Sequence, residues 1–425
     1  VLFLKGAIAE LWLQPDEVQL LAFPLTDDLV AIHLVGIFGW LGMPFAFNVL
    51  SRTLLLLVRQ AITGAASMYV DDVMGCSPRQ ALTTDMERAT TAITGLAGDD
   101  SLAPEKVEKG RCLEFIGWVV CLDTRTITAS PRLLLKTTQA LFCFHEDDRV
   151  SQLHLQRLAS LTSRLSLLCN YMRPFTRHLA IESAQFQLNP NTRHHLSSAA
   201  KNEVWMWRAF LLILQAPGVT LHRPIASFRP GVPSFELHYD ASLNQIAVGL
   251  YTQPGDHRQL RAFTAHLLPF TFTTDSSKQN TCEFLAVVLG LVLAASLHIR
   301  HASYVLYGDS VSSLAWASSG RAASCLAARA NLALASLSVQ LNVDVAGTVH
   351  VPGHQNVVYD GLSRGKTAEE VGLPPSLQVS FPPSHPAAAI VALCDPALPL
   401  PTALAMTALM GQFIRLIRNI IHPLP

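Results

Sequence analysis

The stretch Met68-Tyr69-Val70-Asp71-Asp72-Val73-Met74 places two adjacent carboxylates between short apolar flanks. Tyr69 and Val70 favour extended backbone, the two aspartates favour a turn, and the apolar pattern then resumes. We therefore predict a β-hairpin. Two carboxylates held side by side repel each other, and a divalent cation lets both stay ionised. An acidic turn that merely faces water is the alternative, because charged turns are common.

The composition predicts a folded chain of several domains. With 425 residues, half of them hydrophobic, the chain can bury two or three separate cores. The 31 basic and 31 acidic residues balance. Net charge therefore gives no support for nucleic-acid binding, which would need a local excess of basic residues.

The eight cysteines show no paired spacing, which argues against a zinc site or a disulfide framework. We expect a reducing compartment and thus an intracellular protein, cytoplasmic or nuclear. The sequence begins without Met and without the charged segment of a signal peptide, so we expect a fragment that starts within a domain.

The most apolar run covers residues 284–297. It is shorter than the ~20 residues that a membrane span needs. We expect a buried helix and no membrane partner.

The order of expected elements divides the chain into four parts, which are residues 1–128, 129–223, 234–366 and 367–425. The first part mixes strands and helices, and it should end in a hairpin over 111–128 with its bend at 122–125. The second part reads as helical. The third has three strands, a helix, a strand, helices, a strand and a helix, which specify an α/β domain. The fourth is rich in Pro and Ala, and we expect a loosely ordered tail with one helix at 402–421.

The helical part has a basic face. Leucines at helical spacing run from Leu158 to Leu168, while Arg157 and Arg164 share another face. The basic face suits a phosphate backbone. A solvated face on an ordinary helical bundle explains the same residues.

Four carboxylates in the third part stand beside apolar segments, where a charge costs several kcal/mol unless it is paired or bound to metal. They are Asp240, Glu283, Asp309 and Asp360. Glu283 is expected to open an apolar helix, with Asn280 or Thr281 as its N-cap. Any one of these acids alone can be structural, but four in this order indicate a functional site.

The acidic hairpin resembles a known family. Tyr69-Val70-Asp71-Asp72 is similar to the metal-binding hairpin of reverse transcriptases, residues 39–48 resemble the segment before it, and Phe115-Ile116-Gly117-Trp118 resembles the primer-grip hairpin. The resemblance implies that Asp71 and Asp72 bind metal. It also requires a third carboxylate on the neighbouring strand, but the matching position is Phe3, which cannot bind Mg²⁺.

The third part resembles the RNase H family. The similar segments are residues 238–242, 281–286, 307–310 and 350–364. The resemblance implies that the four carboxylates hold two Mg²⁺ ions about 4 Å apart, which cleave the RNA strand of an RNA/DNA hybrid. His350 matches the family's mobile catalytic histidine, and we prefer it to His354 for handling protons. Both histidines could instead simply lie on an exposed loop.

Together these features predict an α/β and α+β multidomain protein with a partial polymerase palm (1–128), a helical thumb or connection (129–223) and an RNase H-like α/β domain (234–366). The resemblance implies a fragment of a retrotransposon polyprotein that cleaves hybrids with Mg²⁺, its DNA polymerase activity impaired by Phe3. Two alternatives remain. One is a functional reverse transcriptase whose missing aspartate is supplied differently, and the other is an inactive relic that only binds nucleic acid or a partner.

Overall fold

The computed structural model describes residues 2–4, 22–26, 29–32, 43–143, 149–185, 193–215, 221–225, 233–252, 258–269, 276–320, 325–392, 395 and 403–421. The chain divides into two compact units, Val1–Asp123 and Thr124–Pro425. The boundary falls inside the first predicted domain. The finer division of the second unit into domains stays a prediction.

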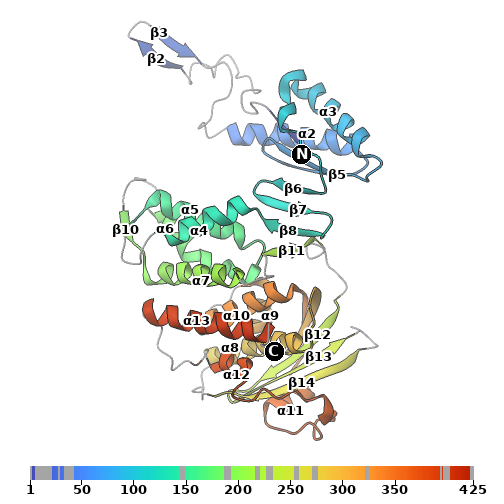
Figure 1. Cartoon of the computed structure of the whole chain (residues 1–425), viewed down its shortest axis with the longest axis vertical. Helices are drawn as coiled ribbons and strands as arrows, with labels where there is room; N and C mark the ends of the chain where they lie inside the picture. The colour runs from blue at the N-terminus through green and yellow to red at the C-terminus, as the bar shows by residue number, and fades with distance from the viewer. Residues whose placement is uncertain are drawn as a thin grey trace. The chain divides into compact units, whose positions relative to one another are not determined.

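The first unit is built on a three-stranded sheet of order β1-β5-β4, with β1 (Leu2–Phe3), β4 (Ala65–Tyr69) and β5 (Asp72–Cys76). Helices α2 (Met43–Ala61) and α3 (Leu82–Ala97) bury their apolar faces against it in one core (Figure 1). A separate hairpin joins β2 (Ala22–Thr26) and β3 (Leu29–Ile32). The predicted acidic hairpin is confirmed, because β4 and β5 pair as far as Tyr69 and Asp72.

A second hairpin of this unit joins β6 (Cys112–Phe115) to β7 (Trp118–Cys121) through a two-residue turn at Ile116-Gly117. The predicted bend at 122–125 is confirmed as a turn between β7 and β8 (Thr126–Ala129), the first strand of the second unit. The prediction of one hairpin over 111–128 is incomplete, because it missed the turn at Ile116-Gly117. The strong β-formers Trp118, Val119 and Val120 made the whole stretch look continuous.

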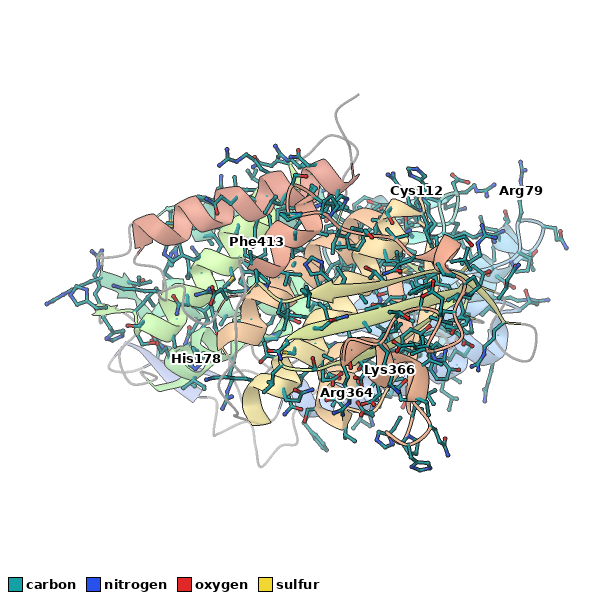
Figure 2. All side chains as sticks on the ribbon, turned by 90° about the horizontal axis from the view of Figure 1, so that it is seen from below. Arg79, Cys112, His178, Arg364, Lys366 and Phe413 are labelled. Atoms are coloured by element: carbon teal, nitrogen blue, oxygen red, sulfur yellow. A yellow bond between two sulfur atoms is a disulfide. The ribbon has the colours of Figure 1, made fainter. Side chains whose placement is uncertain are left out.

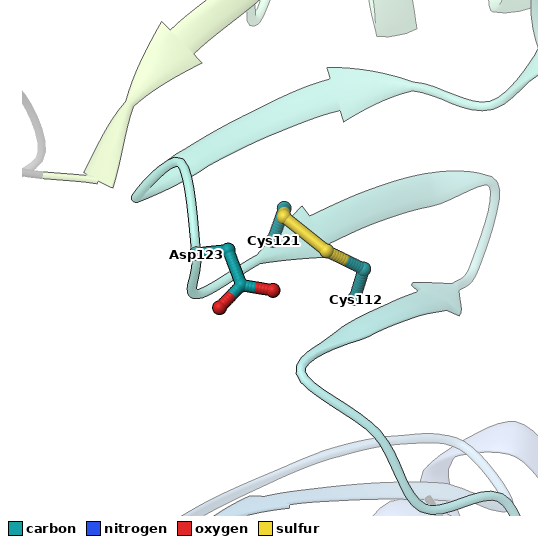
Figure 3. A group of neighbouring side chains, drawn as sticks. All are labelled: Cys112, Cys121 and Asp123. Atoms are coloured by element: carbon teal, nitrogen blue, oxygen red, sulfur yellow. A yellow bond between two sulfur atoms is a disulfide. The ribbon is translucent and has the colours of Figure 1, made fainter.

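Cys112 and Cys121 form a disulfide across the β6–β7 hairpin (Figure 3). The expectation that the cysteines are unpaired is wrong here. Their spacing in the sequence carries no signal, but the tight turn makes them direct partners in the antiparallel ladder. Direct partners on neighbouring strands have Cα atoms close enough for a disulfide.

After β8 the second unit continues with a helical region, as predicted. Its helices are α4 (Pro131–Phe142), α5 (Gln152–Leu165), α6 (Arg177–Gln185) and α7 (Ser198–Leu214), with a 3-10 segment η5 (Asn170–Thr176) and short strands β9 (Arg149–Ser151), β10 (Arg193–His195) and β11 (His222–Pro224). Ser130, Ser151 and Ser197 cap α4, α5 and α7 by accepting a backbone N–H. Leu158 and Leu165 are fully buried, which confirms the predicted apolar face.

The rest of the second unit is organised around a five-stranded sheet of order β14-β13-β12-β15-β16. The strands are β12 (Phe235–Ala241), β13 (Gln245–Thr252), β14 (Gln259–Leu267), β15 (Ala302–Gly308) and β16 (Val343–His350). β12, β13 and β14 run antiparallel, whereas β12, β15 and β16 run parallel. The helices are α8 (Ser276–Ser296), α9 (Val311–Ser319), α10 (Cys325–Leu341) and α11 (Val357–Ser363). This element order is the one predicted for the α/β part of the chain, and its RNase H-like identity stays a prediction.

The long helix α8 forms the centre of this core. Its residues 284–294 are buried, as predicted for this apolar run. Among the described residues, Lys278–Ser296 alone is long and apolar enough for a membrane span, and 83% of that window is buried in the protein. The prediction that Glu283 opens the helix is wrong, since α8 begins at Ser276. The polar residues before Glu283 continue the helix instead of capping it.

The segment after the predicted α/β domain is ordered by packing. Ala368 joins a core cluster with Phe263 and Tyr359, and the backbone N–H of Val379 donates to the carbonyl of Phe263 at 2.8 Å. We call residues 367–381 the edge segment, because Gln378 forms a bridge with β14, the outer strand.

The last elements are η7 (Pro375–Leu377), α12 (Pro386–Ala392) and α13 (Ala403–Ile421). Phe413, labelled in Figure 2, and Ile417 bury the apolar face of α13. The expected terminal helix is confirmed. The expectation of a loosely ordered tail is wrong for residues 367–392, because composition does not show that this segment finds a core to pack against.

Candidate active site

Three carboxylates meet at one end of the five-stranded sheet. Asp240 is the second-last residue of β12, and Asp309 directly follows β15. β12 and β15 are parallel, with His238 level with Tyr307, so Asp240 and Asp309 emerge at the same edge. Glu283 reaches this edge from α8. Ligand oxygens of the three side chains all lie within 4.8 Å of one another.

The site is buried, and its electrostatics reflect that. Asp240 and Glu283 are each 3% exposed. Burial raises the pKa of Asp240 to about 7, the Ser363 hydroxyl opposes this, and the charges of Asp309 and Asp360 add to it. Burial, followed by repulsion from Asp240 and Asp309, raises the pKa of Glu283 well above its usual range. Nearby cations would favour the ionised forms of these groups.

Glu283 offers direct support for a cation. Its Oε1 accepts from the backbone N–H of Ala241 at 3.3 Å and from Gln279 Nε2 at 3.1 Å. Its Oε2 is buried and accepts no hydrogen bond from the residues that the structure describes. A carboxylate oxygen can only accept, so a buried one without a donor suits a metal ligand. A set of carboxylate oxygens is what Mg²⁺ prefers.

Asp360, the fourth predicted ligand, lies at the rim of this cluster. Its Oδ1 accepts from Arg364 Nε at 2.7 Å, and its side chain is 36% exposed. Its charge raises the pKa of both Asp240 and Asp309. The structure thus brings three of the four acids within mutual coordinating distance, and the role of Asp360 as a ligand stays a prediction.

His350 lies beside the cluster. It pairs with Gly308 in the β15–β16 ladder, and its Nε2 is 3.1 Å from the backbone carbonyl of Asp309. His354 lies on the exposed turn that follows. The geometry therefore places the preferred histidine next to a predicted metal ligand, and its proton-handling role stays a prediction.

The acidic hairpin of the first unit differs from this cluster, because its carboxylates are less buried. Asp71 lies in the turn and Asp72 begins β5, and both are partly exposed. Burial, followed by the charge of Asp71, raises the pKa of Asp72, while Lys106 lowers it. Phe3 is the ladder partner of Asp72, and the backbone N–H of Leu4 donates to the Asp71 carbonyl at 2.9 Å. Position 3 thus lies on the strand beside the hairpin, as predicted.

Among the described residues, Asp71 and Asp72 belong to no group of three metal-binding side chains. The other such group is Cys112, Cys121 and Asp123 (Figure 3). Its two sulfurs are joined in the disulfide, and Asp123 accepts from Arg111 at 2.6 Å. These atoms are already committed to each other, so this group is no metal site.

The sequence suggested no role for Asn356, the N-cap of α11, or for Ser363, its last residue. The Ser363 hydroxyl donates to Asp240 Oδ2, and Asn356 Nδ2 lies 3.4 Å from Asp240 Oδ1. Asn356 comes four residues before Asp360 and Ser363 three after it, so all three share one helical face. That spacing is the signal that could have identified them.

No family model and no curated protein matches the chain. Among solved structures, it is similar to foamy viral protease-reverse transcriptase dRH with double-stranded DNA, at 12% identity and TM-score 0.40, over 83% of this chain and 56% of that one. Foamy viral protease-reverse transcriptase in complex with an RNA/DNA hybrid is similar at 14% identity and TM-score 0.39. The match covers 84% of this chain and 44% of that one. The chain thus spans about half the length of these structures. Function must be argued from the site itself.

Proposed function

We propose that the chain is a reverse transcriptase-like retroelement fragment whose RNase H-like domain cleaves the RNA strand of RNA/DNA hybrids with Mg²⁺. The observation that carries this proposal is the group of Asp240, Glu283 and Asp309 at the end of parallel strands, in which Asp240 and Glu283 are buried and Glu283 Oε2 has no donor among the described residues. Asp360 would complete the set. Mg²⁺ bound there would activate a water and stabilise the leaving oxygen.

The protein residues have separate tasks in this reaction. Asp240 and Glu283 are buried, so their charges act in a site of low dielectric, where electrostatic effects are large. A backbone carbonyl can only accept, so His350 Nε2 carries the hydrogen that faces Asp309. The other ring nitrogen, Nδ1, is then the atom that can take up a proton.

Positive charge is available next to the site for a polyanionic substrate. Arg364 and Lys366 follow α11 and are labelled in Figure 2. The Arg364 side chain is 70% exposed even though it pairs with Asp360. Exposed Arg and Lys contact phosphates without reading sequence. This arrangement supports a backbone contact to the hybrid.

The acidic hairpin supports no comparable proposal for DNA synthesis. Position 3 pairs with Asp72 and carries a phenyl ring in place of a carboxylate. A two-metal centre there would lack the ligand shared between the ions. We therefore propose that polymerase activity of this chain is absent or strongly impaired.

A labelled RNA/DNA hybrid tests the proposal. We expect Mg²⁺-dependent RNA cleavage by the wild-type chain, loss of cleavage in Asp240→Asn, and normal cleavage in the control Asp71→Asn. Equal cutting by wild type and Asp240→Asn would end the proposal. Salt-sensitive hybrid binding without cleavage at any Mg²⁺ concentration would favour a relic that only binds nucleic acid.

A further inference from the structure

Helix α11 contacts the central carboxylate of the site from both of its ends. Asn356, at the N-terminal end, is 6% exposed, and Ser363, the last residue, is 1% exposed. Both side chains contact Asp240, on β12. A short helix that carries one predicted ligand, Asp360, is therefore also bonded to another.

We propose that Ser363 is a positioning residue that orients the Asp240 carboxylate for metal binding, an inference that rests on the proposed function of this site. The Ser363 Oγ contacts Asp240 Oδ2 and also lies 3.0 Å from the carbonyl of Asp360. A hydroxyl has one hydrogen to donate. An ionised carboxylate is the stronger acceptor, so that hydrogen goes to Asp240.

Asn356 supports the same carboxylate from its other oxygen. Its Nδ2 donates to the carbonyl of Tyr239 at 3.0 Å and lies 3.4 Å from Asp240 Oδ1. Each oxygen of Asp240 thus faces one donor from α11. Every carboxylate oxygen has two lone pairs, so one on each remains for a cation. The two donors fix the plane of the carboxylate without using up its ligand capacity.

The position of α11 on the sheet is itself fixed by one close fit. Tyr359 is 3% exposed, and its Oη donates to Tyr251 Oη at 2.8 Å. A Cβ added to Gly249 would lie 1.7 Å from Tyr359 Oη. The missing side chain of Gly249 therefore makes room for the Tyr359 ring. This fit sets how closely α11 approaches β13, and hence where the Ser363 hydroxyl lies.

Substitution of Ser363 tests the proposal through metal binding. Mn²⁺ is the probe, because its binding to the full chain can be followed by electron paramagnetic resonance without substrate. Loss of a hydrogen bond that orients a ligand commonly costs 10–100-fold in metal affinity. We expect Ser363→Ala to weaken Asp240-dependent Mn²⁺ binding by about that factor, and Ser363→Thr, which keeps the hydroxyl, to restore most of it.

Ser336→Ala is the matched control. Ser336 is also fully buried in the second unit, and its Oγ donates to the Leu332 carbonyl at 2.8 Å, within α10. It should leave Mn²⁺ affinity unchanged. If Ser363→Ala does not fold, Ser363→Cys keeps the volume but replaces the hydroxyl with a weak donor, and it should lower the affinity in the same direction.

Wild-type Mn²⁺ affinity in folded Ser363→Ala or Ser363→Cys would overturn the proposal, as would wild-type protein that binds no Mn²⁺ through Asp240. The assay also separates this proposal from the proposed function. If the wild-type chain binds Mn²⁺ but leaves hybrids uncut, the enzymatic activity fails while the effect of Ser363 on the metal site is still measured.

Discussion

The two acidic clusters of this chain differ in how the fold holds their carboxylates. Asp71 and Asp72 are neighbours in one hairpin and stay partly exposed. Asp240, Glu283 and Asp309 come from two strands and a helix, converge within 4.8 Å, and include two buried side chains. The first pair is held together by one turn. The second group is held together by a whole domain, which keeps its charges close despite their repulsion.

The largest expected difference between the two sites is in activity. Loss of a metal ligand removes several kcal/mol of transition-state stabilisation, which corresponds to about a thousandfold in rate. Glu283→Gln should therefore reduce hybrid cleavage by about that factor, whereas Asp72→Asn should leave it unchanged. Initial rates on a labelled hybrid measure both.

Primer extension by the wild-type chain completes this test. We expect no Mg²⁺-dependent synthesis, because position 3 is Phe. Robust synthesis that disappears in Asp72→Asn would show that the hairpin binds metal without a third carboxylate, and the contrast between the two sites would collapse.

The next largest effect is on how the free energy of unfolding depends on pH. Asp240 has a pKa of about 7 in the folded chain, against an ordinary value near ~3.9 when unfolded. Between these values the folded state holds a proton that the unfolded state has lost. Stability without metal should therefore fall as pH rises from about 4 to 7, by up to about 4 kcal/mol.

Urea unfolding in EDTA between pH 5 and 8 measures this dependence. Asp240→Asn should reduce this pH dependence, leaving the part due to Glu283, whose pKa burial also raises. It should be more stable than wild type at pH 8, and we expect it to be inactive. If the stability of the wild-type chain rises from pH 5 to pH 8, the pKa of Asp240 is not raised by folding.

A smaller effect is expected for the disulfide in the first unit. Cys112 and Cys121 are 9 positions apart, and a loop of that size corresponds to about 2–3 kcal/mol of stabilisation. Under oxidising conditions, Cys112→Ser should lower the melting temperature of the first unit, with hybrid cleavage unchanged. Cys76→Ser, which removes an exposed free thiol of the same unit, is the control. Equal melting of both variants would show that the cross-link adds nothing to the paired hairpin.

The smallest effect concerns the turn of the acidic hairpin. Val70 has φ 54, a left-handed conformation that a β-branched residue rarely adopts, and its side chain is 49% exposed. Val70→Gly should relieve about 1 kcal/mol of backbone strain while losing little packing. A chemical denaturation curve that shows destabilisation instead would mean that the Val70 side chain contributes more than its exposure indicates.

Local patterns in the sequence predicted much of this structure. The strands and helices from Phe235 to Ser363 follow from alternation, apolar runs and turn residues, and Asp240 and Asp309 stand where two of these strands end. The start of α8 was misplaced because polar residues before Glu283 resemble a cap but continue the helix.

Contacts between distant residues were the part that the sequence did not reveal. The Cys112–Cys121 pairing depends on ladder register, and the Ser363–Asp240 bond joins residues 123 positions apart. The fit of Tyr359 over Gly249 likewise exists only once the sheet is formed. No single segment carries a signal for such contacts, because each depends on where another element ends up.

The edge segment has a practical consequence for solubility. β14 is the outer strand of the five-stranded sheet, and Gln378 and Val379 pair with Phe263 along it. A chain cut after residue 366, where the α/β pattern ends, would leave these backbone groups open and uncover the apolar side chains beneath them. Open strand edges of this kind recruit other chains. Such a truncated protein should self-associate. By covering this sheet edge, residues 367–381 should protect the full chain from aggregation.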